Sequence, residues 1–138
     1  MSRRDLFHDA VRRALEKEGW TITHDPLKLV YGETKTFVDL GASAPLGASR
    51  EGRVIAVEIK SFVGLSGLND LYGAVGQFVV SRSLLELQDP ERVIFIALPD
   101  EAFQELLTVR EGRHLIVSAK LKLIVFEEET EVITQWIE

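Results

Sequence analysis

The sequence predicts an α/β protein in which helices flank a mixed β-sheet, and three observations lead to that class. Residues 3–18 and 68–87 repeat apolar residues at spacings of three and four, which is typical of amphipathic helices. "RVIAVEIKSF" (53–62) and "RVIFIALP" (92–99) are rich in β-branched residues, and the second is apolar enough to be buried on both sides. A long helix between two such strands is the usual crossover of a parallel pair, so these strands should be neighbours at the centre of the sheet.

The remaining elements follow from turn residues and helix breakers. Ser2 is the expected N-cap of the first helix and Gly19 its expected stop, while "WTIT" is a short strand that ends before Pro26. The other predicted elements are strands at 27–32 and 34–42 joined by a turn at "GET", a loop at 42–52, a short helix at 100–107, a helical turn in the second half of 109–120, and a hairpin of strands at 121–126 and 131–137 across "EEET". With "WTIT" left out of the count, the element order is α-β-β-β-α-β-α-β-β.

The composition fits a single domain over residues 1–138. Hydrophobic residues make up 46% and charged residues 28%, and no repeat or linker divides the chain. No apolar stretch approaches the roughly 18 residues of a membrane span, and the N-terminus lacks the apolar core of a signal peptide. We therefore expect a cytoplasmic protein that starts near Met1 and has no membrane partner. The absence of cysteine excludes disulfides, thiolate metal ligands and thiol nucleophiles.

The charge balance bears on nucleic-acid binding. The net charge is −6, whereas proteins that bind nucleic acid through bulk electrostatics usually present a basic surface. Arg3, Arg4, Arg12 and Arg13 form a local basic excess, and carboxylates that ligate a metal would themselves contribute negative charge. The acidic balance is therefore an argument against a nuclease without excluding one.

Two opposite charges stand at the end of the strand "RVIAVEIKSF". Side chains alternate along a strand, so Val57 and Ile59 should face one way while Glu58 and Lys60 face the other. Asp39 ends the preceding apolar strand and would converge with Glu58 if the two strands are neighbours. A structural ion pair is one interpretation of this constellation, and a metal-dependent nuclease site is the other.

The metal interpretation rests on ligand chemistry. The carboxylates of Asp39 and Glu58 with the backbone carbonyl of Ile59, completed by water, form a suitable partial shell for Mg²⁺ or Mn²⁺. Such a metal would polarise a phosphate and activate water, and Lys60 would orient that water or offset the developing charge. The tripeptide alone is weak support, because a second Glu-x-Lys occurs at Glu33-Thr34-Lys35, in a predicted turn with no buried strand before it.

The pattern Asp39…Glu58-Ile59-Lys60 resembles the PD-(D/E)xK motif of restriction-endonuclease-like nucleases, with Val38 in place of the motif's proline. The resemblance implies a restriction-endonuclease-like mixed sheet flanked by helices. It also gives Gln77 the place of a helical glutamine or lysine that many members carry near the catalytic site. Many members place an acidic metal ligand in the first helix. Here His8 or Asp9 falls close to that place, and because neighbouring helix positions do not share a face, at most one of them points into the site.

Longer segments resemble the XisH family, the fdxN element excision controlling factors known from cyanobacteria. The segments are "DLFHDAVRRALEKEGWTITHDPL", "FVDLGA", "IAVEIKSF", "NDLYGAVGQFVVSRSLLE" and "LKLIVFEEETEVITQWI". The resemblance covers almost the whole chain. It implies a role in controlling excision of a DNA element during heterocyst development, and a small XisI-like companion protein as partner. It does not imply catalysis, since the recombinase of that system is a different protein.

Two functions therefore remain open. The first is a Mg²⁺- or Mn²⁺-dependent endonuclease that acts on DNA through Asp39, Glu58, Lys60 and Gln77. The second is a non-catalytic regulator that uses a degenerate nuclease fold to bind a companion protein or DNA. A homodimer is compatible with either function. The three histidines His8, His24 and His114 match no metal-ligand spacing, and His24, beside Asp25-Pro26, is expected to hydrogen-bond locally.

Overall fold

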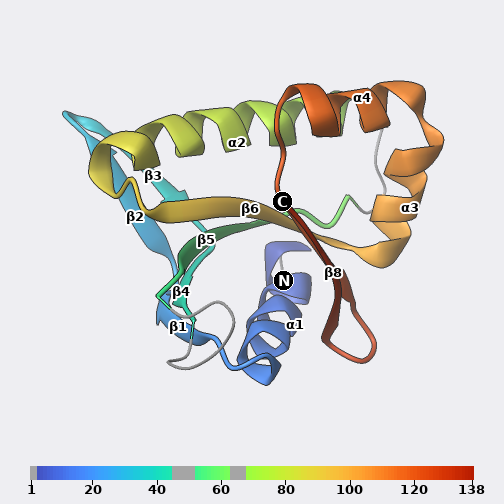
Figure 1. Ribbon diagram of the computed structural model, residues 1–138, viewed down its shortest axis with the longest axis horizontal. Coiled ribbons are helices and arrows are strands. Elements are labelled where there is room, and N and C mark those ends of the chain that lie inside the picture. The colour runs from blue at the N-terminus through green and yellow to red at the C-terminus, as the bar shows by residue number, and fades with distance from the viewer. Residues whose placement is uncertain (1–2, 45–51, 63–67) are drawn as a thin grey trace.

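The computed structural model describes residues 3–44, 52–62 and 68–138, and within them a sheet is enclosed by helices (Figure 1). Its six strands run in the order β1-β4-β5-β6-β7-β8, and β2 and β3 form a separate two-stranded sheet. The elements are α1 (Arg3–Lys17), β1 (Thr21–His24), β2 (Leu27–Tyr31), β3 (Thr34–Val38), β4 (Leu40–Ser43), β5 (Val54–Ile59), α2 (Leu68–Gln88), β6 (Arg92–Pro99), α3 (Asp100–Thr108), α4 (Arg110–Ser118), β7 (Leu123–Glu127) and β8 (Val132–Ile137).

The mixed character of the sheet is as predicted. β5 pairs in parallel with β6, and β6 with β7, while the three remaining pairs are antiparallel. β5 and β6 are the two central strands, and α2 makes the crossover between them. The structure thus confirms a mixed α/β protein that is consistent with the predicted order, with the two apolar segments side by side at the centre.

Two apolar layers hold the helices against the sheet. Odd-numbered residues of β5, including Val57, pack with α1 residues such as Val11 and Leu15 on one face. On the other face Ala56 packs with Phe78 of α2 and Phe103 of α3. In Figure 1 α1 lies below the sheet, α2 and α4 lie above it, and α3 lies at its right-hand end. Each face of β5 is therefore covered by a helix, which explains why this strand is apolar over almost its whole length.

The prediction of one strand over 34–42 was wrong. Val38 packs in the layer under α2, whereas Leu40 packs in the layer under α1. In a continuous strand these two residues would share a face, so the chain must turn between them, at Asp39. β3 therefore pairs with β2 in the hairpin, and β4 pairs with β5 in the main sheet.

Most other boundaries agree with the sequence to within two residues. α1 ends before Gly19, whose φ of 91° suits glycine. The hairpin of β7 and β8 spans the predicted turn. α4 is longer than predicted, because it fills nearly the whole of 109–120 and not only its second half. Ser2 and most of the predicted loop at 42–52 lie outside the described residues. None of the helices in the described part of the chain combines the length and apolarity of a membrane span.

Candidate functional site

Glu58 comes from the middle of the buried sheet. It follows Ala56 on the face of β5 that α2 covers, and its side chain is only 3% exposed. Val57 and Ile59 point to the opposite layer. The predicted alternation is therefore correct, and Glu58 carries a carboxylate into an otherwise apolar layer. Such a group is costly to bury unless hydrogen bonds compensate for its lost hydration.

Gln77 of α2 supplies one such hydrogen bond and at the same time reaches Lys60. Its Nε2 donates to Oε1 of Glu58 over 2.9 Å, and its Oε1 accepts from Nζ of Lys60 over 2.7 Å. Only this orientation of the amide satisfies both neighbours, because an ammonium group donates and a carboxylate accepts. Gln77 thus stands between the two charges, and this side chain from the crossover helix connects them.

Asp39 reaches the same strand from the turn between β3 and β4. Its Oδ2 accepts a hydrogen bond from the backbone amide of Ile59 over 2.7 Å. Leu40 lies opposite Val57, and the two strands are antiparallel. The residue before Leu40, Asp39, therefore lies at the level of the residue after Val57, Glu58. The bend that ends β3 therefore places the second carboxylate beside the first. The structure brings Asp39, Glu58, Lys60 and Gln77 together at this end of β5.

The backbone of Ile59 also faces this site. The amide of the next residue, Lys60, bonds to Ala97 of β6, which directs the amide and carbonyl of Ile59 to the other edge of β5. The amide of Ile59 is already bound to Asp39 on that edge. Its carbonyl oxygen therefore lies on the side of the strand where Asp39 stands.

The donor set is one of hard oxygen ligands. In the parts of the chain that the structure describes, no three acidic or histidine side chains gather closely enough to form a metal site by themselves. Mg²⁺ commonly takes one or two carboxylates and completes its shell with water and substrate phosphate. The carboxylates of Asp39 and Glu58 with the carbonyl of Ile59 fit that chemistry, and they do not offer the nitrogen or sulfur ligands that zinc prefers.

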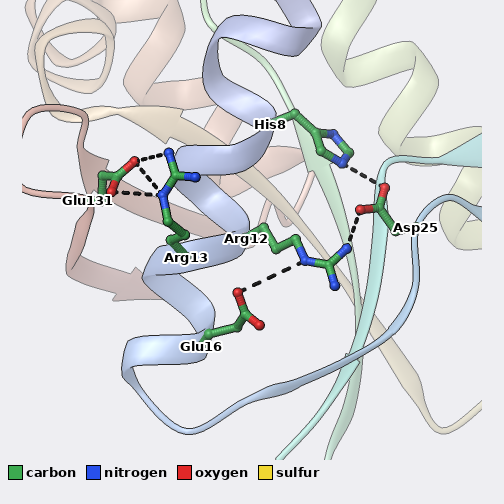
Figure 2. Close-up of polar contacts among 6 residues, drawn as sticks. All are labelled: His8, Arg12, Arg13, Glu16, Asp25 and Glu131. Carbon is green, nitrogen blue, oxygen red and sulfur yellow. Dashed lines mark hydrogen bonds and ion pairs between the residues drawn. The ribbon is translucent and has the colours of Figure 1, made fainter.

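His8 of the first helix contacts the turn after β1. Nε2 of His8 lies 2.7 Å from Oδ1 of Asp25, whose Oδ2 accepts from Arg12 over 2.6 Å (Figure 2). Asp9, the other candidate first-helix ligand, is exposed. The described contacts of His8 thus join it to the turn after β1, and they do not join it to Asp39 or Glu58.

Sequence reasoning missed the role of Asp25. His8 and Arg12 are four residues apart and so share a face of α1, which indicates a common partner, but their spacing does not identify it. His24 bonds to its neighbour Thr23 over 2.9 Å, as expected for a local contact. The second Glu-x-Lys, Glu33 to Lys35, is exposed in the turn and first residues of the hairpin, where the sequence placed it.

Fold and site together define a mixed α/β domain. Its central strand β5 ends in a carboxylate and a lysine, and a side-chain amide from α2 joins them. The chain belongs to the XisH family: the family model described as XisH protein matches residues 1–134. It is similar to the crystal structure of an XisH family protein from Nostoc punctiforme PCC 73102, with 36% identity and a TM-score of 0.87 over 97% of this chain and 100% of that one.

A second solved structure gives the same result. The fdxN element excision controlling factor protein from Anabaena variabilis is 35% identical, with a TM-score of 0.88 over 98% of this chain and 100% of that one. Among curated proteins, no sequence matches the chain. Both solved relatives share the whole fold, including the part that carries the cluster.

Proposed function

We propose that this protein controls excision of a DNA element and that it does so with a metal-dependent phosphodiesterase site in a restriction-endonuclease-like domain. The controlling role is supported by membership of the XisH family and by the description of the Anabaena variabilis relative. The observation that carries the catalytic part is the hydrogen-bonded series Lys60–Gln77–Glu58 with Asp39 beside it. A cytoplasmic location follows from the proposed DNA substrate.

Each residue has a distinct part in the proposed site. Asp39 and Glu58, with the Ile59 carbonyl, would hold Mg²⁺ or Mn²⁺, and a bound metal of this kind supplies polarisation of a phosphoryl oxygen and activation of water. Asp39 is held in orientation by the Ile59 amide, so it needs little reorganisation to act as a ligand. Lys60 places an ammonium group where negative charge would develop on the phosphate. Gln77 is a positioning residue, since it orients both Glu58 and Lys60.

Calorimetric titration of Mn²⁺ and Mg²⁺ tests the site directly. The wild-type chain should bind the ion, and the double variant Asp39→Ala/Glu58→Ala should not. A matched control is Glu128→Ala/Glu129→Ala, which removes two carboxylates from the exposed β7–β8 turn and should bind like the wild type. Absence of binding by the wild-type chain, both alone and with DNA present, would reject the metal site.

A second candidate function has its own observation. The exposed side of α2 carries several apolar and small residues beside polar ones such as Ser83 and Glu86, where a solvent-facing helix is normally polar throughout. Its exposed residues include Tyr72, Gly73, Gly76, Val79, Val80 and Leu87. Exposed apolar patches of this kind are typical of protein interfaces. The alternative is therefore a non-catalytic regulator that docks a companion, an XisI-like protein or a second copy of itself, along α2.

Val80→Glu distinguishes this alternative. Val80 is 55% exposed on α2, and a charge there should abolish co-purification with the XisI-like companion or self-association in sedimentation velocity. Val117→Glu is the matched control, because Val117 is a valine exposed to 76% on α4. If both variants keep the complex, α2 is not the docking face. If the complex depends on Val80 and no metal binds, the regulator without catalysis is the correct function.

A further inference from the structure

The hairpin of β2 and β3 (27–38, called the arm below) has two chemically different faces. Leu27, Leu29 and Val38 are buried in the layer under α2. On the opposite face Lys28 lies across from Phe37, and Val30 lies across from Lys35. The outer face is thus a square in which two lysines occupy one diagonal and two apolar side chains the other. Diagonal neighbours in such a ladder lie about 7–8 Å apart.

All four outer residues are exposed. Phe37 is 53% exposed, although burial of a phenylalanine is strongly favourable. Neither lysine has an ion-pair partner among the described residues, in a chain whose net charge is −6. Lysines on a short hairpin discourage pairing with other strands, but that role does not explain an exposed aromatic ring between them.

The arm is anchored and ends at the candidate site. Gln88, at the end of α2, accepts a hydrogen bond from the Val30 amide over 2.8 Å and donates to the Lys28 carbonyl over 3.2 Å. These bonds fix the hairpin to the helix that also carries Gln77. Phe37 is only two residues before Asp39, so the aromatic ring and its opposite neighbour Lys28 stand at the end of the arm nearest to the carboxylates.

We propose that the outer face of the arm binds single-stranded DNA, with Lys28 and Lys35 contacting phosphates and Phe37 stacking on an unpaired base. Alternation of cations and an aromatic ring on a fixed strand pair is the chemistry by which proteins hold single strands without reading their sequence. The inference extends the proposed function, because a strand held there leads toward Asp39 and Glu58. The binding itself requires neither metal nor cleavage.

Fluorescence anisotropy with a short labelled single-stranded DNA in EDTA tests this. Lys28→Gln/Lys35→Gln should weaken binding and reduce the slope of log affinity against log salt by about 1.4, as expected for two lost contacts to single-strand phosphates. Phe37→Thr keeps a strand-forming residue and should lower the affinity by a factor between about 5 and about 150, the range for one lost base stack.

Matched controls separate the arm from the rest of the surface. Tyr72→Ala removes an aromatic ring that is also 53% exposed, but on α2, and Lys120→Gln removes an exposed lysine between α4 and β7. Both should bind DNA like the wild type. Urea unfolding confirms that each variant is folded.

Four results would overturn the proposal: a wild-type chain that does not bind, arm variants that bind normally, controls that lose as much affinity as the arm variants, or arm variants that lose only the companion protein. The DNA-binding measurement contains EDTA and therefore does not depend on the metal site. Failure of the metal site and failure of the arm are therefore separate results.

Discussion

The side-chain amide of Gln77 donates to the buried carboxylate of Glu58 over 2.9 Å, and this contact ties the crossover helix to the central strand. The carbonyl of the same amide holds Lys60. A group that connects two functional side chains affects both stability and activity, so the two effects have to be measured separately.

We predict that Gln77→Ala lowers the free energy of unfolding by about 1–3 kcal/mol, because a buried carboxylate loses a hydrogen-bond donor. A double-mutant cycle with Glu58→Ala should give a coupling energy of about 0.5–3 kcal/mol. Urea unfolding measures both quantities. Gln104→Ala is the control, because Gln104 donates to Asp100 in an exposed pair, and it should change stability by no more than about 0.5 kcal/mol. A coupling energy near zero would contradict the contact.

Lys60→Ala should reduce the turnover number for DNA cleavage by about 10²–10³, the usual effect of removing one group that stabilises developing charge. Because Lys60 is half-buried and its contact is with Gln77, the variant should remain folded and should still bind Mn²⁺. Single-turnover cleavage at saturating Mn²⁺ measures the effect, with Lys120→Gln as the control. Turnover equal to that of the wild type would remove Lys60 from the mechanism.

Much of the site could be predicted because it depends on local geometry. The two-residue alternation of β5 places Glu58 and Lys60 on one side, and the length of α2 makes it a crossover helix that passes over that side. The central pairing of β5 with β6 follows from the same reasoning. These features need only the periodicity of the segments and the general rules of strand connection.

The features that could not be predicted depend on contacts between distant segments. The bend at Asp39 exists because Val38 and Leu40 enter different apolar layers, and a sequence does not reveal which layer a valine or leucine will join. The bond between Asp39 and the Ile59 amide depends on the register of β4 with β5, which their periodicity leaves open. The partner of His8 could not be foreseen for the same reason, since Asp25 lies 17 residues away.

The exposed glycines of α2 provide a third prediction. A methyl group added at Gly73 or Gly76 would meet no atom within 4 Å, and glycine in a helix is less stable than alanine by roughly 0.5–1 kcal/mol. Gly73→Ala and Gly76→Ala should therefore each raise the free energy of unfolding of the monomer by about that amount. Gly112→Ala is the contrasting control, because its Cβ would lie 2.4 Å from the Leu106 carbonyl oxygen, and it should destabilise.

Measurements at two protein concentrations separate the effect on the monomer from an effect on self-association. Urea unfolding should be repeated at two concentrations, since a self-associating chain becomes more stable as concentration rises. If Gly76→Ala destabilises only at the higher concentration, α2 is covered by a second copy. Destabilisation at both concentrations would contradict the open space found around these glycines.

The contact between α1 and the β7–β8 turn predicts a pH dependence. Nε of Arg13 donates to both carboxylate oxygens of Glu131, over 2.9 and 2.8 Å (Figure 2). This hydrogen bond, together with the positive charge of Arg13, holds the pKa of Glu131 below its ordinary value of 4.5. A carboxyl group with a lowered pKa in the folded state binds protons more readily when unfolded. Its contribution to stability is therefore present above pH 4.5 and is lost as the pH falls through the lower, folded pKa.

In the wild type, the free energy of unfolding should fall as the pH is lowered from about 5; this fall is called the acid limb below. Glu131→Gln should make the fall less steep. Arg13→Ala should do the same, because it removes the cause of the lowered pKa. Glu128→Gln, in the same turn, should keep the wild-type limb. Because the pair is exposed, added salt should weaken the difference between wild type and Glu131→Gln. An acid limb in Glu131→Gln that matches the wild type at low salt would show that this ion pair does not couple α1 to the hairpin.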